Sequence, residues 1–338
     1  THVLMSERPC SRWDVIVVDD QSSDNTVKIA EQAIVTVAGA DQPGATVLQA
    51  GPRPKGERWV GKNWGCCQAM EQVNSEWVLF IDADVTLAPD AIRRALHQSI
   101  NENADLFSLA PRLTCGCLAE WMVQPIMASL LGLGFPILEA NDPASTVAFA
   151  AGPFMLFRRV SYNAIGGHRA LAGEVVEDLA LARRIKEGGF RLRYVLGIDA
   201  VDLQMYANLQ ALWEGWSKNW FLGLDRSISK SLGAGGVVLL MFTLPWLLLP
   251  ASLTMACLSS QDQILWLSDA GLGLIAILMQ LNVRLWTRAR FSVPLRHWWL
   301  MGIGGMIIGL IAPTSVWKSL TGRGWTWKGR SLAEAQAR

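Results

Sequence analysis

Apolar and polar positions along the first 225 residues follow two alternating periods. Residues 13–18, 45–49, 77–81 and 105–110 are short runs of apolar β-formers, and amphipathic stretches with helical spacing separate them. Polar turns rich in Asp, Gly or Pro end most of these runs. This alternation predicts an α/β domain with a mixed, mainly parallel sheet and helices on both of its faces.

Three stretches near the C-terminus carry almost no charge. Residues 231–261 and 298–317 have no charged side chain, and Asp269 is the only one in residues 263–283. Each stretch reaches the roughly 20 residues that a helix needs to cross a bilayer. We therefore expect two or three transmembrane segments, at about 234–258, 263–283 and 298–317.

These stretches divide the chain into two expected domains. Residues 1–225 form the α/β domain, which ends in Trp-rich, amphipathic and interfacial helices. Residues 226–338 form an α-helical membrane domain. Several glycines and Pro313 interrupt the last apolar stretch, so it either spans the bilayer or forms a re-entrant hairpin.

The charges are nearly balanced but unevenly placed. The chain has 30 Lys and Arg residues and 29 Asp and Glu residues, and the net charge of +1 gives no reason to expect nucleic-acid binding. Basic residues flank the apolar stretches, whereas the loop between the first two holds only Asp262. By the positive-inside rule, the protein is an integral membrane protein of the inner or plasma membrane with its α/β domain on the cytoplasmic side. A basic tail opposes this orientation if the third stretch spans; it contains Lys318, Arg323, Lys328 and Arg330.

The six cysteines do not suggest a disulfide framework. A chain of this length with a cytoplasmic domain does not need one. Cys115 and Cys117 lack a second pair at metal-site spacing, so we interpret them as ordinary small residues near a helix start.

Two carboxylates stand at the end of one predicted strand. The apolar run 77–81 leads directly into Asp82-Ala83-Asp84. Open α/β sheets bind ligands at the carboxyl ends of their strands, and Mg²⁺ or Mn²⁺ takes oxygen ligands there. The pattern favours a cation that holds a nucleotide diphosphate. The alternative is a strand that ends in a polar turn.

Other charged residues mark the ends of elements. Asp19 and Asp20 close the first strand, where a carboxylate either hydrogen-bonds a nucleoside or caps a helix. Lys62 opens a helix, a position that suits an anion or an ordinary surface lysine. Glu177 and Asp178 begin another helix; they either interact with its dipole or supply a base that accepts a proton from a hydroxyl.

Five segments in this order resemble the inverting family 2 glycosyltransferases of GT-A fold, over about residues 13–225. Segments at 59–62, 166–168 and 322–330 are similar, more narrowly, to membrane-bound glycosyltransferases of carotenoid and hopanoid pathways and to ceramide glucosyltransferase. The five segments are VVDDQSSDNT, RWVGKNWG, FIDADVTLAPDAI, AGPFMLFRR with YNAIGGHRA, and EVVEDLALARRIKEGGFRL.

The resemblance implies a reaction and a set of site residues. A nucleotide sugar, UDP-glucose by family precedent, gives its sugar to a lipid-soluble or carotenoid-type hydroxyl at the cytoplasmic membrane face, in one inverting displacement assisted by Mg²⁺ or Mn²⁺. Asp178 is the expected base. The other expected residues are Asp19, Asp20, Lys62 and Asp82 for the donor, Asp84 and Asp82 for the metal, and Glu177, Gly152 and His168 near the acceptor or diphosphate.

The chain departs from the family pattern in three places. A polar residue expected after Gly152 is replaced by Pro153. The Gln-X-X-Arg-Trp motif of related enzymes is absent, and Trp216, Lys218 and Asn219 either replace it near the acceptor or belong to an aromatic belt at the membrane interface.

The third departure concerns the family's first strand. That strand carries a Pro and an Asn-Glu pair, and it is not found after Thr1, so we expect it to be missing. A catalytically decayed scaffold or partner protein is therefore an alternative. A glycosidase that uses two carboxylates is another.

Overall fold

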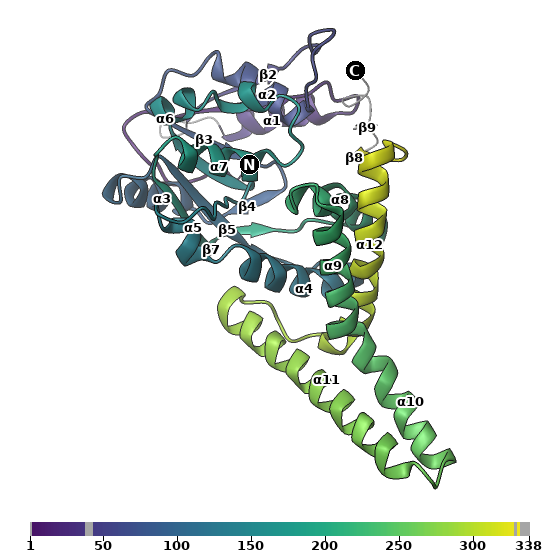
Figure 1. Ribbon diagram of the computed structural model, residues 1–338. Coiled ribbons are helices and arrows are strands. Elements are labelled where there is room, and N and C mark those ends of the chain that lie inside the picture. The colour runs from purple at the N-terminus through teal and green to yellow at the C-terminus, as the bar shows by residue number, and fades with distance from the viewer. Residues whose placement is uncertain (1, 38–42, 328–329, 332–338) are drawn as a thin grey trace. The chain divides into compact units, whose positions relative to one another are not determined.

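The computed structural model of the protein describes residues 2–37, 43–327 and 330–331 (Figure 1). Thr1 and Lys328, both named above, lie outside the described residues. Tertiary contacts divide the chain into two compact units. The first unit comprises Thr1–Arg112 and Phe135–Leu203, and the second comprises Leu113–Gly134 and Gln204–Ala337. The second unit thus contains two helices that precede the expected domain boundary at residue 225.

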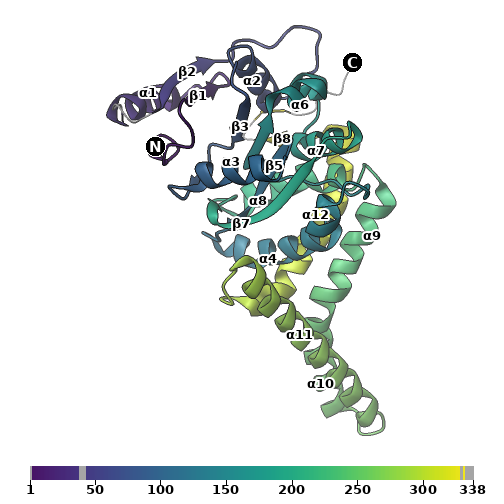
Figure 2. The ribbon, with the colours of Figure 1, turned by 90° about the vertical axis from the view of Figure 1, so that its left-hand side faces the viewer.

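The first unit contains strands in two sheets. The parallel pair β1 (Asp14–Asp19) and β2 (Gly44–Gln49) is connected by α1 (Thr26–Val37), which lies beside both strands (Figure 2). The other sheet has the order β3-β6-β5-β7-β4. Its strands are β3 (Trp77–Ile81), β4 (Val85–Leu87), β5 (Leu106–Leu113), β6 (Phe154–Arg158) and β7 (Leu192–Leu203).

Strand direction in the five-stranded sheet differs from the expectation. β3 and β5 run the same way, as alternating strands and helices predict, but β6 inserts between them antiparallel to both. β4 also pairs antiparallel with β7. The α/β class and the mixed sheet are confirmed, whereas a predominance of parallel pairs is not found among these three pairings. The alternation of elements does not show that a later strand will occupy the place between two earlier ones.

Helices cover both faces of this sheet, as predicted. Alternate residues of β5 and β6 point to opposite sides, so Leu106 and Phe157 pack with Leu181 of α7, whereas Phe107 and Leu156 pack against α3. Burial of each such side chain stabilises the fold by about 1.5–3 kcal/mol. The helices of the unit are α2 (Gly61–Met70), α3 (Ala91–Asn101), α5 (Ile137–Asn141), α6 (Arg159–Ala164), the 3₁₀ turn η1 (Gly167–Leu171) and α7 (Glu177–Glu187).

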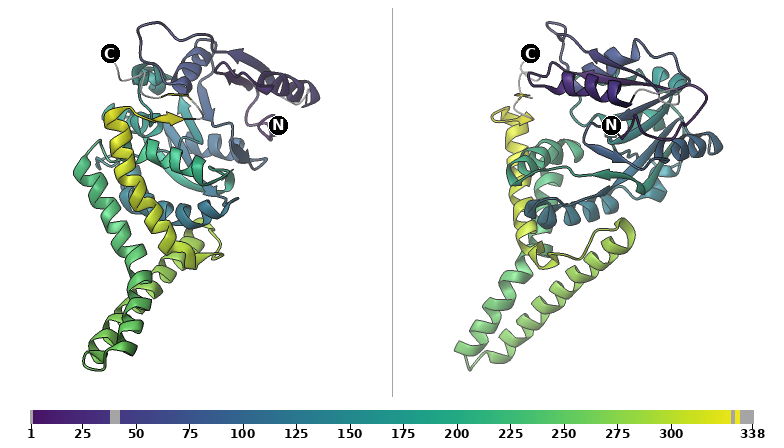
Figure 3. Two further views of the ribbon diagram at one scale, coloured as in Figure 1. Left: turned by 90° about the vertical axis from the view of Figure 1, so that its right-hand side faces the viewer. Right: turned by 180° about the vertical axis from the view of Figure 1, so that it is seen from behind.

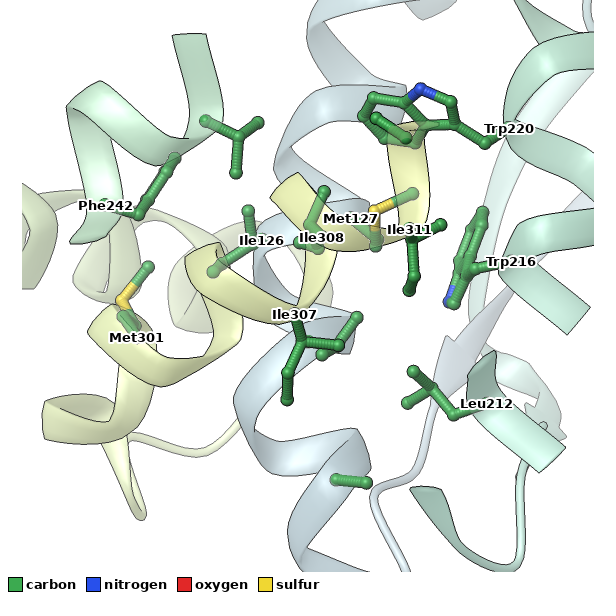
Figure 4. Packing of buried hydrophobic residues seen from close by; sticks show 14 of the residues in the cluster. Ile126, Met127, Leu212, Trp216, Trp220, Phe242, Met301, Ile307, Ile308 and Ile311 are labelled. Atoms are coloured by element: carbon green, nitrogen blue, oxygen red, sulfur yellow. The ribbon is translucent and has the colours of Figure 1, made fainter. Parts of the chain in front are cut away.

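The second unit is helical, apart from the short pair β8 (Thr326–Trp327) and β9 (Arg330–Ser331). Trp216 and Trp220 of one helix and Ile308 and Ile311 of another meet in its buried core (Figure 4). The helices are α4 (Leu118–Gly134), α8 (Leu209–Gly223), α9 (Ile228–Val238), the π-helical turn η2 (Leu239–Thr243), α10 (Leu244–Leu258), α11 (Gln263–Phe291), the 3₁₀ turn η3 (Trp298–Leu300) and α12 (Met301–Thr321).

Three helical stretches are long and apolar enough to cross a membrane: Ile228–Leu258, Gln263–Phe291 and Trp298–Thr321. They differ in burial. In the first two, 22% of the most apolar window is buried inside the protein, and in the third 61% is buried. α12 lies alongside α9 in both views of Figure 3 and also contacts α4 and α8. The last stretch is therefore largely enclosed by protein.

The π-helical turn coincides with a proline. Pro245 has no N–H to donate to the carbonyl oxygen of Met241, four residues earlier. The side-chain Nε2 of Gln280 on α11 donates to that oxygen at 2.8 Å, and its Oε1 accepts from Trp246 Nε1 at 2.8 Å. A polar side chain thus donates to the carbonyl oxygen that a proline N–H cannot reach.

Candidate active site

Three segments far apart in the sequence meet at Lys62. The lysine lies in the first turn of α2, and its Nζ is 2.6 Å from Asp82 Oδ1 at the end of β3 and 2.6 Å from Glu177 Oε1 at the start of α7. Burial lowers the pKa of Lys62, but the two carboxylates outweigh this effect and raise it well above its usual value. Burial raises the pKa of Asp82, and Lys62 opposes that rise. The lysine is therefore a permanent cation between two carboxylates.

Asp178 lies beside this cluster but has different partners. Its Oδ2 accepts a hydrogen bond from the backbone N–H of Gly152 at 3.0 Å, and its Oδ1 accepts from Leu179 N–H at 2.8 Å. Burial, together with the charge of Glu177, raises the pKa of Asp178 to about 6, against the lowering effects of Lys62 and the two N–H groups. A carboxylate of this pKa is mostly ionised at pH 7 and accepts a proton more readily than an exposed Asp.

Gly152 allows the close approach of backbone and carboxylate. A Cβ atom at this position would lie 2.9 Å from Asp178 Oδ2, closer than a carbon and an oxygen approach without a shift. The absence of a side chain lets the N–H of Gly152 reach the carboxylate directly. The structure thus gives this glycine a positioning role toward Asp178.

Asp20 is held at the start of α2. Arg53 Nη2 lies 2.7 Å from Asp20 Oδ2, and a Cβ atom at Gly61 would overlap the same carboxylate oxygen. Asp19 is buried, and its carboxylate accepts from the N–H of Ser22 at 3.2 Å. Of the two, Asp20 is the more accessible, with 24% of its side chain exposed.

Asp84 is exposed and follows Asp82 by two residues. Within residues 2–37, 43–327 and 330–331, no group of three or more His, Cys, Asp or Glu side chains is placed to hold a metal ion. Mg²⁺ commonly binds through one or two carboxylates and takes its other ligands from substrate phosphates and water. The Asp82–Asp84 pair fits a cation that arrives with a diphosphate, and not a site built from protein alone.

His168 is buried behind the cluster. Only 2% of the residue is exposed, its Nδ1 lies 2.7 Å from the hydroxyl of Tyr162, and its ring meets Phe80 edge to face at 4.7 Å between centroids. Burial lowers its pKa to about 4, so the imidazole is neutral at pH 7. This environment indicates support for the site; a direct contact of His168 with acceptor or diphosphate stays a prediction.

Trp216, Lys218 and Asn219 lie on α8 in the second unit. Trp216 is buried, and its Nε1 donates to Gln124 Oε1 at 2.9 Å. It belongs to the core of that unit and not to an exposed aromatic belt. A role of these three residues at the acceptor stays a prediction.

Sequence reasoning missed three residues near the site. Arg53 pairs with Asp20, Tyr162 pairs with His168, and Cys66 lies one turn after Lys62 with its thiol pKa raised to about 12 by burial. Arg53 stands in a Pro- and Gly-rich loop, where spacing carries no information about partners. All six cysteines are free, as expected.

Comparison with known proteins finds both a family and individual relatives. The model of the family "Glycosyl transferase family 2" matches residues 2–166. A curated relative, 4,4'-diaponeurosporenoate glycosyltransferase of Staphylococcus aureus strain USA300, is 29% identical over 232 residues, which are 68% of this chain and 58% of the relative. The same protein of the bovine strain RF122 / ET3-1 is 28% identical over an equal length. The chain thus spans 58% of the length of these relatives.

Similar solved structures include S. aureus TarS 1-349 in complex with UDP-GlcNAc, with a TM-score of 0.42, 13% identity, and coverage of 96% of this chain and 87% of that one. Glucosyl-3-phosphoglycerate synthase from Mycobacterium tuberculosis, in complex with Mn²⁺ and UDP-glucose, has a TM-score of 0.32, 18% identity, and coverage of 58% and 62%. Both likenesses are distant. The family match and the curated relatives agree with the resemblance found in the sequence: residues 2–166 match the model of glycosyl transferase family 2.

Proposed function

We propose that the protein transfers a sugar from a nucleotide sugar to a lipid-soluble acceptor at the cytoplasmic face of a membrane. The observation that carries this proposal is Asp178, a carboxylate with raised pKa held next to the Lys62–Asp82–Glu177 cluster. Lys62 and Asp82 lie in the segment that matches the glycosyl transferase family 2 model. A decayed scaffold would have no need to retain this arrangement of charges.

Asp178 acts as the base in this proposal. Its carboxylate takes the proton of the acceptor hydroxyl while the hydroxyl oxygen forms a bond to the anomeric carbon. The bond from that carbon to the diphosphate breaks in the same step, so the configuration inverts. The N–H groups of Gly152 and Leu179 fix the orientation of the carboxylate.

The donor side is formed by the residues at the strand ends and at α2. Asp20, together with Asp19, contacts the nucleoside, and Lys62 lies close enough to Asp82 to contribute positive charge near the diphosphate. Asp82 and Asp84 would hold Mg²⁺ or Mn²⁺, and this cation, when bound, supplies charge that stabilises the departing diphosphate. UDP-glucose is the donor that we would test first.

The acceptor class follows from the membrane unit and from the relatives. Three helices have the length and composition of membrane spans. The curated relatives are named for diaponeurosporenoate, whose name is that of a carboxylate. A carboxylate acceptor is therefore a second candidate beside a hydroxyl. It is already ionised at pH 7 and needs no base, so the two acceptors predict different consequences of losing Asp178.

The test uses membranes from cells that express the chain, supplied with radiolabelled UDP-glucose and Mn²⁺, with label counted in the organic-solvent extract. For a hydroxyl acceptor, Asp178→Asn should lower the label by about 10²–10⁴-fold. Glu187→Gln is the matched control, because it removes an exposed carboxylate from the same helix. Full activity of Asp178→Asn would contradict the base and favour a carboxylate acceptor. No label from any of a panel of UDP- and GDP-sugars would contradict the transferase.

A further inference from the structure

Arg284, near the C-terminal end of α11, is fully buried in the second unit. Its Nη2 donates to the carbonyl oxygens of Pro294 at 2.8 Å and Arg296 at 3.2 Å. Its Nε and Nη1 have no hydrogen-bond partner among the described residues. A guanidinium has five donors in a planar fork, and leaving part of the fork unpaired inside a protein is costly.

The charge of Arg284 also lacks a counter-ion in the described part of the chain. The ionisable group that acts on it is the thiol of Cys115, and burial together with Glu120 raises the pKa of that thiol to about 12, so it is neutral at pH 7. The nearby carboxylate of Glu120 is occupied by the backbone N–H groups of Gly116 and Tyr206, each at 2.8 Å. Protein groups therefore supply neutral acceptors alone.

The segment that covers Arg284 connects α11 to η3. It begins and ends at residues with left-handed backbone, Ser292 at φ 56° and His297 at φ 59°. Non-glycine residues in this region store roughly 1 kcal/mol or more of strain each. The contacts of Arg284 to Pro294 and Arg296 hold this segment, but they use one nitrogen of the fork and neutral carbonyl oxygens.

We propose that Arg284 binds an oxyanion, the carboxylate or phosphate head group of an amphiphile, which accepts from its unpaired Nε and supplies the missing counter-ion. Nε–H lies on the side-on edge of the fork together with Nη2, so an anion at this edge would accept from Nε and share Nη2 with the carbonyl oxygens of Pro294 and Arg296. The position at the end of a long apolar helix fits a ligand whose tail lies among apolar side chains. The ligand is a membrane phospholipid or a lipid acid, and its binding does not require the transfer reaction.

The experiment measures binding to the purified full-length chain in neutral detergent by native mass spectrometry. One arm compares phosphatidylglycerol with diacylglycerol, and the other compares oleate with oleyl alcohol, so each pair differs by the oxyanion. We expect wild-type protein to bind at least one anionic probe more tightly than its neutral match. Arg284→Gln should weaken that binding about tenfold or more. Arg288→Gln, which removes an exposed arginine one turn later, should change it less than threefold.

Two results would overturn the proposal. One is equal binding of anionic and neutral probes by the wild-type protein. The other is equal loss of binding in Arg284→Gln and Arg288→Gln, which indicates attraction to surface charge in general. If Arg284→Gln does not fold, a phosphatidylglycerol or lipid acid with a photoreactive group at its head distinguishes the outcomes in wild-type protein: cross-links at residues 113–117 or 292–297 support the site, and cross-links elsewhere contradict it.

Discussion

Each unit of the molecule contains a cation that is wholly or partly removed from water, half-buried Lys62 and fully buried Arg284, and the two cations have different partners. Lys62 in the first unit lies 2.6 Å from each of two carboxylates. Arg284 in the second unit contacts backbone carbonyls and has no described counter-ion. A cation between carboxylates belongs to an internal network whose charges depend on one another. For a cation without carboxylate neighbours, the strongest partner would be an anion that is not part of the protein. Removal of the Lys62 charge should therefore destabilise the protein more than removal of the Arg284 charge.

The largest effect is expected for Lys62→Met. Loss of the ammonium leaves Asp82 and Glu177 as neighbouring negative charges without compensation, and sugar transfer should fall about a hundredfold. After allowance for solvent screening, the free energy of unfolding should fall by about 1–2 kcal/mol. Arg284→Met should change the free energy of unfolding by less than about 1 kcal/mol in detergent without anionic lipid. Chemical denaturation of both variants tests the contrast, which fails if Arg284→Met is the less stable of the two.

Acidification should reduce transfer about tenfold between pH 7 and pH 5 for a hydroxyl acceptor. The pKa of Asp178 is raised to about 6, so the base is protonated below this value and ionised above it. A raised pKa means that the Asp178 carboxyl holds its proton more tightly in the folded state than in the unfolded state. Ionisation of Asp178 therefore lowers the free energy of unfolding. Asp178→Asn should therefore be more stable than wild type above about pH 6 and lose this advantage below it. A transfer rate that does not change over this pH range would contradict the assignment.

Gly152→Ala should lower transfer by about tenfold with little loss of fold. The added Cβ would lie 2.9 Å from Asp178 Oδ2, so the carboxylate must turn away from the N–H that orients it. Donor binding, measured by titration with UDP, should stay within twofold of wild type. Gly134→Ala is the control, because open space surrounds that glycine. Equal effects of both substitutions would remove the positioning role.

The smallest effect is expected for Gln280→Leu in the second unit. The substitution removes the side-chain donor to the carbonyl oxygen of Met241 and the acceptor of Trp246 Nε1, at a cost of about 1 kcal/mol. The midpoint of thermal unfolding in detergent should fall by a few degrees. Gln210→Leu, on α8, is a surface comparison. An unchanged midpoint would show that the π-helical turn does not depend on Gln280.

The sequence predicted the parts of the site that lie at the ends of elements. Asp82 at a strand end, Lys62 at a helix start and Glu177 at another are recognisable because polar residues there interrupt apolar periodicity, and the structure brings these three together. The pairing of Arg53 with Asp20 joins loops whose path depends on the whole fold. The insertion of β6 between β3 and β5 is likewise a choice of topology that local periodicity does not record.

Burial within the second unit was equally out of reach of the sequence. Trp216 and Arg284 both stand in stretches whose composition suits the edge of a membrane, yet one is a core residue and the other an enclosed cation. Hydropathy reports what a segment is made of. It does not report whether lipid or protein surrounds the segment.

The burial of α12 affects whether the chain crosses the membrane twice or three times. If Trp298–Thr321, whose most apolar window is 61% buried, belongs to the protein interior, Ile228–Leu258 and Gln263–Phe291 form a single hairpin through the bilayer. Two crossings return the chain to the side from which it left. Lys318 and Arg323 then lie on the same side of the membrane as Arg288, Arg290 and Arg296, which stand between the second and third apolar stretches. The positive-inside rule is then obeyed at every loop.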